Sequence, residues 1–323
     1  MNRGASLFTG LLVALGIATS GCGGDFDPGS RITGLRVLAV KAEDDKTYAH
    51  PGEKVQLTAL WNASKDDNGG DVGTQWAWAT CVNPSSSTVL GCFQKLIEDV
   101  QKTGVRPDFG IGVNKDVFTF TVPTDALSQL PPEARRNALV GVITIVCSGE
   151  LTPTPETSPD ARTVPFQCKA GDRVLGLDEY IAGFKRIFIR EKDRNLNPKP
   201  SQITWDGQPW DDKEPFKTIT ACDTDGNRYD RCTDADHHDV AMVLTDDSYE
   251  SGKDEYGVDF TEQVIVEYYA TEGLFEHDVR IAKDPHTAFV GRTQSKGKTV
   301  TLWFVAHDNR GGVTWATRKV VVN

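Results

Sequence analysis

Oxygen-bearing side chains crowd the segment CDTDGNRYDRC, which begins at residue 222. Calcium takes roughly six to eight oxygen ligands, and a glycine inside such a loop lets them converge. The segment departs from the EF-hand pattern, because Arg228 stands where that pattern needs glycine. Two interpretations stay open: a loose calcium site, or a solvated acidic hairpin in which Asp and Asn bond their own backbone. The candidate calcium ligands are Asp223, Asp225, Asn227 and Asp230.

Two other groups of side chains suit ligand binding. His237 and His238 stand beside acids and could hold zinc or copper. Neighbours on a strand point to opposite faces, however, which favours ordinary surface histidines. Trp205 and Trp210 flank a turn, where exposed indole faces would stack on sugar rings. These two tryptophans are therefore a candidate carbohydrate-binding platform, whereas the other tryptophans favour a sandwich core.

The motifs of common hydrolases are missing from the sequence. It holds no GxSxG nucleophile turn, no HExxH zinc motif and no glycine-rich phosphate loop after a predicted strand. A pair of glycosidase carboxylates stays open among the 46 acidic residues, because sequence gives no distances. We therefore expect a protein that is not an enzyme and requires no cofactor, with calcium as an optional ion.

The cysteines point to an oxidising compartment. Six of the seven follow residue 80, and an even number outside the cytoplasm is typical of disulfides. Six cysteines allow fifteen pairings, and sequence alone does not decide among them. They fall in three successive pairs that each close a short loop, so sequential pairing is expected. The expected disulfides are Cys81–Cys92, Cys147–Cys168 and Cys222–Cys232.

The N-terminus reads as an export signal. Arg3 precedes a mostly apolar stretch, Leu7 to Ile17, that suits a signal peptide and is too short to span a bilayer. The following TSGC, ending at Cys22, resembles the lipobox of bacterial lipoproteins, although Thr19 stands where that family usually has leucine. The resemblance implies cleavage before Cys22, a palmitate-type lipid on its thiol and anchoring at the outer membrane. An ordinary signal peptide is the alternative. We expect a signal peptide at 1–21 and a flexible tether at 22–34.

The net charge argues against some classes of binding partner. The chain of 323 residues carries a net charge of −11. An acidic surface argues against nucleic acid and against anionic lipid headgroups as partners. The length beyond the signal suffices for two domains of ordinary size.

Strand patterns dominate the mature chain. VQLTALW from Val55 alternates apolar and polar residues, and the hairpin of VTLWFVA and VTWA near the C-terminus does the same. Phe93, Leu96, Ile97 and Val100 share the spacing of one helix face, as expected for an inserted helix covering an edge or end of the sheets. The fold class is therefore all-β, with two immunoglobulin-like antiparallel β-sandwich domains, at 35–193 and 194–323.

Several runs resemble known exported modules. GLRVLAVKAE…PGEKVQLTALW, DRNLNP…ITWDG, EYYATEGLF and LWFVAHDNRGGVTW are similar to runs in lipoproteins of myxobacteria and their relatives. The last runs also resemble polycystic-kidney-disease-type and bacterial Ig-like repeats. The resemblance implies the fold and an exported, lipidated state, and no activity. We expect a non-enzymatic, lipid-anchored envelope or surface protein acting as a structural or interaction module on a protein or glycan partner. A carbohydrate-binding or adhesion lipoprotein, stiffened by calcium, and an accessory subunit or hydrolase are the alternatives.

Overall fold

The computed structural model describes residues 28–63, 73–103, 112–113, 115–153, 166–175, 180–214, 216–222, 229 and 232–323. The expected signal peptide and the lipobox Cys22 lie outside these residues. The described part is mostly β-structure, so the expected all-β class is confirmed. Within it, no helix is long and apolar enough to cross a membrane.

Two sheets form the N-terminal sheet pair. The three-stranded sheet has the order β1-β3-β6, and the five-stranded sheet has the order β2-β11-β7-β4-β5. All neighbours run antiparallel except β2 and β11. Alternating side chains of β3, among them Val55 and Leu57, pack against Trp76 and Trp78 of β4 between the sheets. The strands are β1 (Arg36–Ala42), β2 (Tyr48–Ala49), β3 (Lys54–Asn62), β4 (Gln75–Val82), β5 (Gly112–Val113), β6 (Val117–Thr121), β7 (Leu139–Cys147) and β11 (Tyr180–Ile189).

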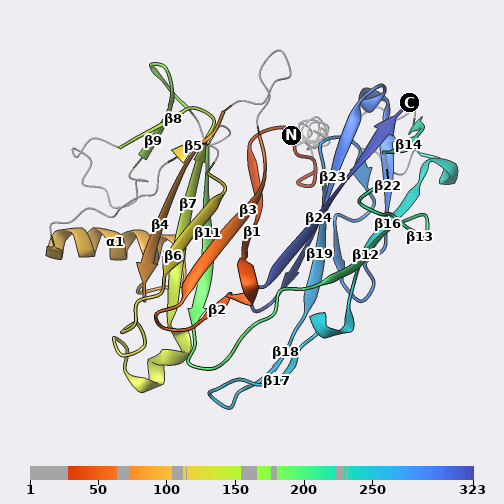
Figure 1. The fold of residues 1–323 in the computed structure, drawn as a ribbon. Helices are drawn as coiled ribbons and strands as arrows, with labels where there is room; N and C mark the ends of the chain where they lie inside the picture. Colours follow the sequence, from red (N-terminus) through yellow and green to blue (C-terminus); the bar gives the residue numbers. More distant parts are fainter. Residues whose placement is uncertain are drawn as a thin grey trace, which may run out of the picture.

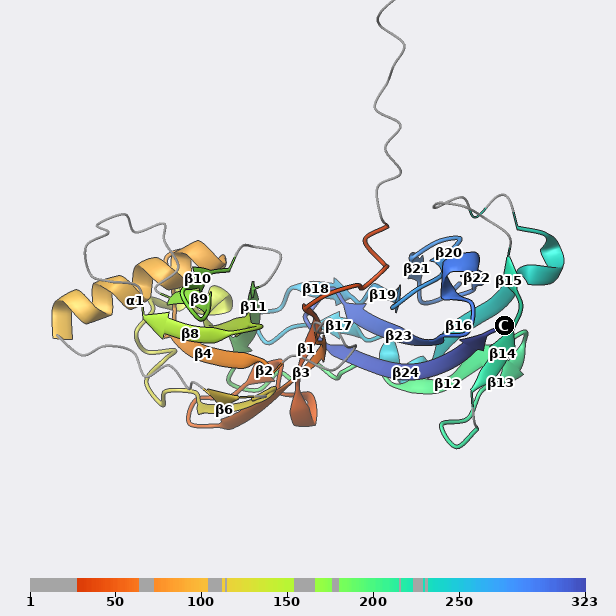
Figure 2. The same cartoon turned by 90° about the horizontal axis from the view of Figure 1, so that it is seen from above.

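The outer face of the five-stranded sheet is also covered. Helix α1 (Val89–Thr103) and the small sheet of β8 (Glu150–Pro153), β9 (Phe166–Ala170) and β10 (Arg173–Val174) lie over it (Figure 2). Every residue of β7 is consequently buried. The expected helix is present, but it covers a face of the sheet rather than an edge or end. Its apolar stripe, Phe93 and Leu96, packs there beside two disulfides.

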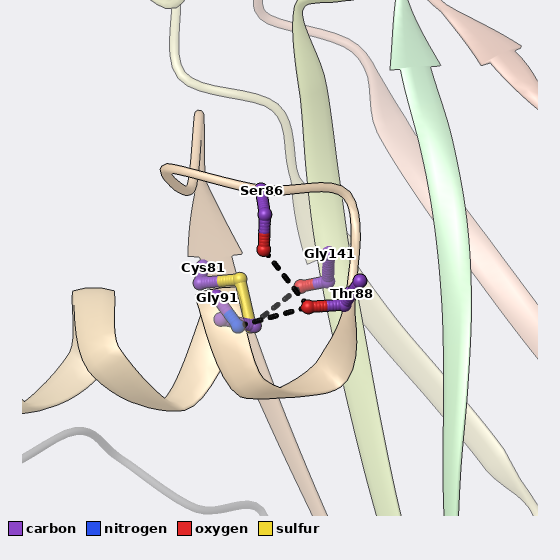
Figure 3. The surroundings of a disulfide bond; sticks show 6 residues. Cys81, Ser86, Thr88, Gly91 and Gly141 are labelled. Atoms are coloured by element: carbon purple, nitrogen blue, oxygen red, sulfur yellow. Dashed lines mark hydrogen bonds between the residues drawn. A yellow bond between two sulfur atoms is a disulfide. The ribbon is translucent and has the colours of Figure 1, made fainter.

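A disulfide fastens the start of α1 to β4. Cys81 and Cys92 are bonded, and Thr88 Oγ1 accepts the Gly91 N–H at 3.2 Å as a cap on the first helical turn (Figure 3). The disulfide lies against β7 at Gly141, where an added Cβ would lie 2.8 Å from Cys81 Sγ. Glycine at that position therefore lets the disulfide lie against the strand.

Two further sheets form the C-terminal sheet pair. One has the order β13-β12-β16-β22-β15, with β20 (Leu274–Phe275) on β22, and the other has the order β14-β24-β23-β19-β21. Their core contains Tyr268, Phe289 and Phe304, all fully buried. The predicted C-terminal hairpin is β23 and β24, so that prediction is confirmed. The strands are β12 (Pro200–Trp205), β13 (Gln208–Pro209), β14 (Lys217–Ile219), β15 (Ala221–Cys222), β16 (His238–Leu244), β19 (Val264–Ala270), β21 (Val279–Ile281), β22 (Thr287–Arg292), β23 (Thr299–Asp308) and β24 (Val313–Val322).

The two sheet pairs lie side by side, with β1 and β3 facing β23 and β24 (Figures 1 and 2). Leu38 packs on Trp303, and Ala39 packs on Val305 and Val313, in two small apolar clusters. A separate hairpin, β17 (Ser251–Lys253) and β18 (Asp259–Thr261), extends from the C-terminal sheet pair at one end of this contact (Figure 1).

The chain before β1 is part of the contact between the sheet pairs. The Ile32 N–H donates to the Ala270 carbonyl at 2.8 Å, and the Ala270 N–H donates to the Ser30 carbonyl at 2.9 Å. Ile32 is 2% exposed and packs beside Trp303. The expectation of a free tether at 22–34 is therefore wrong for Ser30 to Ile32, because backbone pairing and burial hold this stretch on β19.

Candidate functional site: the polar junction

Beside the apolar contact lies a group of charged and polar residues that we call the junction. Five segments supply it: β2 with the loop around it, β11, the linker between the sheet pairs, the segments flanking β17 and β18, and the β23–β24 turn. Its members are Tyr48, Glu53, Lys185, Arg194, Asn195, Asn197, Glu250, Glu262, Asp308 and Arg310.

Arg310, in the β23–β24 turn, is the central cation of the junction. Its guanidinium lies 3.9 Å from the ring centroid of Phe260 and 4.8 Å from that of Tyr48, which belongs to the other sheet pair. Nη2 donates to the Arg194 carbonyl at 3.2 Å. The planar guanidinium can therefore stack on two rings and use its N–H groups at once, which a lysine ammonium cannot do.

Two carboxylates share this guanidinium. Arg310 Nη1 lies 3.0 Å from Glu262 Oε1 and 3.4 Å from Glu250 Oε2. The side chain of Glu262 is 1% exposed, whereas that of Glu250 is 30% exposed. Burial raises the pKa of Glu262 to about 7, and the neighbouring Asp308 and Glu250 carboxylates add to the rise, against the pull of the Glu250 N–H and Arg310.

The turn itself is shaped around Asp308. Its Oδ1 accepts the N–H groups of Arg310 and Gly312, both at 2.8 Å, and its Oδ2 accepts the Asn195 side-chain amide at 3.0 Å. A Cβ on Gly312 would lie 2.1 Å from Oδ2, so the close approach requires glycine. Gly311 adopts a φ of +98°, which also favours glycine.

Arg194 binds the linker to the N-terminal sheet pair. Arg194 makes a two-pronged contact with Glu53, at 2.7 and 2.9 Å, and donates to the Tyr48 carbonyl. Burial raises the pKa of the Glu53 carboxyl, but Arg194, the His50 N–H and Lys46 outweigh it, so its pKa lies below the ordinary value.

Asn195 and Asn197 join the linker to both sheet pairs. Asn195 is fully buried and donates to Asp308. Asn197 donates to the Ala42 carbonyl at 2.8 Å, and its Oδ1 accepts the Val313 N–H at 3.0 Å. The Asn197 amide replaces water for a backbone group of each sheet pair, so the linker is part of the packed structure.

Lys185 of β11 reaches the same turn from the N-terminal sheet pair. Its Nζ donates to the Gly311 carbonyl at 2.6 Å. Burial lowers the pKa of Lys185 to about 8, although the charge of Asp308 acts in the opposite direction.

A second set of contacts closes the end of the junction at the β17–β18 hairpin. The Glu255 carboxylate accepts the backbone N–H groups of Glu191, Lys192 and Asp193 at 2.8 to 3.2 Å. Arg136, in the turn before β7, pairs with Asp254 at 3.4 Å. A polar cleft of about 450 Å³ remains between these segments.

The arrangement can hold two bodies together. The carboxylates of Glu262, Asp308 and Glu53 accept hydrogen bonds from other junction residues, and that of Glu255 accepts them from the linker side. Buried polar groups that satisfy one another in this way fix a single geometry, because any other alignment leaves them unpaired.

The structure tests some of the residues expected from sequence. The bonds Cys81–Cys92, Cys147–Cys168 and Cys222–Cys232 are present, as sequential pairing predicts. Disulfides of this number are typical of exported proteins. Cys22 and the four calcium candidates, Asp223, Asp225, Asn227 and Asp230, lie outside the described residues.

The tryptophan platform is a wrong prediction as far as exposure is concerned. Trp205 is 7% exposed and Trp210 is 2% exposed, and their rings cross at 74° instead of lying coplanar. The tight turn at Asp206 and Gly207 folds both indoles into the core of the C-terminal sheet pair, because burying that area is favourable.

His237 and His238 make separate contacts in the structure. His238 Nδ1 lies 2.9 Å from Asp206 and stacks on Trp205, whereas His237 stacks on Tyr229. No group of three or more metal-ligating side chains occurs among the residues that the structure describes.

Sequence reasoning missed the junction. The sequence pattern places Arg310 only within the C-terminal hairpin, and no motif includes Glu262. Arg310 touches Tyr48 across 262 positions of sequence, so no local pattern announces the contact. The available signal was the polar turn ending in two glycines, which marks a place where backbone and side chains approach closely.

Comparisons with known proteins identify no relative that informs function. No protein-family model matches the chain, and no curated protein matches it. Among solved structures, dimeric latent PorU from Porphyromonas gingivalis is 8% identical, with a TM-score of 0.19 over 90% of this chain and 24% of that one. The chain spans about a quarter of that protein's length, and so low a likeness carries no argument.

Proposed function

We propose that this chain is a non-enzymatic, lipid-anchored protein of the bacterial outer membrane, in which two immunoglobulin-like sandwiches form one rigid structural or interaction module. The observation that carries the proposal is the junction, where Arg310 contacts Tyr48, Lys185 donates to the Gly311 carbonyl and Asn197 bonds to both sheet pairs. A fixed relation presents surfaces of both sandwiches to a partner at no ordering cost.

Export and anchoring are supported separately. Three disulfides suit an oxidising compartment, and the lipobox-like TSGC supplies the thiol for acylation. Two or more acyl chains anchor stably, at roughly 0.8 kcal/mol per buried CH₂. The test is metabolic labelling with an alkyne-bearing fatty acid: the wild-type chain should carry the label in the membrane fraction, and Cys22→Ser should lose both. An unlabelled, uncleaved chain in soluble extract with reduced thiols contradicts the proposal.

The module role has its own test. In photo-crosslinking on intact cells, a partner should be captured by the wild-type chain and lost with Arg310→Ala, which disturbs the junction. Lys253→Ala is the matched surface control, since its side chain is 63% exposed and pairs only with exposed Asp259. Equal capture by all three chains would show that partner binding does not need the fixed arrangement.

A carbohydrate-binding or adhesion role is the second candidate. The observation favouring it is a hollow of about 630 Å³ on the C-terminal sheet pair, where Tyr249 stands beside Asp246, Asp284 and His286. An aromatic face with carboxylates around it suits a sugar ring. A glycan array should then show binding that Tyr249→Ala abolishes; a silent array removes this candidate.

Calcium stays an optional ligand in this proposal. Calorimetry should show heat with wild-type chain and none with Asp225→Ala, because the acidic loop inside Cys222–Cys232 would lose one carboxylate ligand. Absence of heat and of a thermal shift in the wild-type chain would identify the loop as a solvated hairpin.

A further inference from the structure

Carboxylates crowd around Glu262 in the junction. The nearby Asp308 and Glu250 carboxylates disfavour ionisation of Glu262, whereas Arg310 favours it. The side chain of Glu262 is 1% exposed, so water does little to stabilise its charge. Burial of a charge beside like charges is costly, and neutralising one carboxyl by a proton removes that cost.

Local hydrogen bonding decides which carboxyl takes the proton. The carboxylate of Asp308 accepts two backbone N–H groups and one side-chain amide. The side chain of Glu250 is 30% exposed. The side chain of Glu262 is 1% exposed, and its Oε2 accepts the Glu250 N–H at 3.0 Å. Glu262 is therefore the group at which neutralisation gains most.

Arg310 lies against Glu262, and the N-terminal sheet pair covers Arg310 in turn. Tyr48 lies over the guanidinium of Arg310, and the Arg194 carbonyl of the linker accepts one of its N–H groups. Separation of the sheet pairs would admit water to Arg310 and Glu262. We propose that the Glu262 carboxyl takes up a proton as the two sheet pairs dock, so that mild acid tightens the junction and rising pH loosens it.

The direction follows from linkage. The pKa of Glu262 is about 7 when docked and near the ordinary 4.5 when exposed to water. The docked state therefore holds more protons between these values, and the gain in docking is complete below pH 4.5 and lost as pH rises through 7. Lys185, with a pKa of about 8, keeps its charge across this window. Glu53, whose pKa is lowered, opposes docking only in stronger acid.

Hydrogen exchange at the contact measures docking directly. The Ile32 amide bonds to the Ala270 carbonyl of β19, and the Val313 amide bonds to Asn197 Oδ1 of the linker, whose Nδ2 donates to the Ala42 carbonyl of β1. In the disulfide-intact mature chain, their protection factors should rise on the order of tenfold or more from pH 8 to pH 5. Glu262→Gln, which is neutral at every pH, should remove this rise and show high protection already at pH 8.

Two controls isolate Glu262 from other groups. The difference between wild type and Glu262→Gln cancels the effect of every titratable group that the two chains share. Glu214→Gln, a surface change beside Lys217, should leave the wild-type profile intact. Glu250→Gln removes a like charge and should move the midpoint to lower pH.

If the protection factors of wild type and Glu262→Gln change in the same way with pH, the proposal is overturned. A fall of the wild-type protection factors on acidification would also overturn it. A direct titration covers the case in which Glu262→Gln does not fold. The carboxyl carbon of Glu262 in the wild-type chain should titrate near pH 7, and a midpoint below 5.5 would rule the proposal out.

Discussion

Arg310 concentrates the interactions that matter in this molecule. It bonds to Glu262 and to the linker and stacks on Tyr48 of the other sheet pair, while its side chain is only 10% exposed. A buried ion pair adds little net stability over a well-packed apolar pair, but loss of one partner strands the other charge. The alignment of the sheet pairs therefore depends on this residue more than on any exposed salt bridge.

Arg310→Ala should lower the free energy of unfolding by about 3–5 kcal/mol, because Glu262 is left buried without its cation. Urea unfolding at pH 8 measures the loss. Lys253→Ala should change it by less than about 0.5 kcal/mol. Adding Glu262→Gln to Arg310→Ala should recover part of the loss, and a double variant no more stable than Arg310→Ala would contradict the charge argument.

Individual strands were easier to predict than individual polar contacts. VQLTALW alternates because one face of β3 meets the core, and Val55, Leu57 and Ala59 are indeed buried. Arg310, which pairs with Glu262, is covered by Tyr48 from a distant part of the sequence. Composition and residue spacing therefore do not predict that these side chains are buried. Trp205 and Trp210 were misplaced for a related reason: a turn can project its flanking residues outward or fold them into the core, and sequence does not say which.

Among the elements, β7 depends on covers on both faces. The run LVGVITIVC is apolar except for Thr144, as is typical of a strand buried on two sides, and every residue in it is buried. One cover is β1, β3 and β6, and the other includes α1. Helix α1 lies over the sheet because Cys92 ties its first turn to β4.

Removing this tie should release the helix. The double variant Cys81→Ser, Cys92→Ser should lower the free energy of unfolding by about 2–4 kcal/mol, since the loop is no longer closed in the unfolded chain. Hydrogen exchange of the α1 amides should accelerate. The matched pair Cys222→Ser, Cys232→Ser should leave α1 protection unchanged; equal loss of α1 protection in both variants would show that the helix does not depend on its own disulfide.

The molecule consists of two sheet pairs in contact, and the segment before β1 also helps to hold them together. Ile32 inserts between Leu38 and Trp303, one from each sheet pair. If Cys22 carries the proposed lipid, the anchor enters the protein at this contact. Ser30 and Ile32 pair with Ala270 through a contact that is remote in sequence, so no local pattern within the expected tether at 22–34 predicts it.

Ile32→Ala should lower the free energy of unfolding by about 2–4 kcal/mol, because a fully enclosed side chain leaves a cavity. Urea unfolding of the mature chain measures it. Ile281→Ala is the matched control, since that side chain is 62% exposed and its removal should cost almost nothing. Equal stability of the two variants would place Ile32 outside the packed contact.

The fixed alignment of the sheet pairs is most directly tested by residual dipolar couplings of the backbone amides at pH 6. If the junction holds one rigid body, couplings from β1, β3, β4 and β7 and couplings from β16, β19, β23 and β24 will fit a single alignment tensor. Two tensors of different magnitude would mean that the sheet pairs move independently, and that result would contradict the role assigned to the junction.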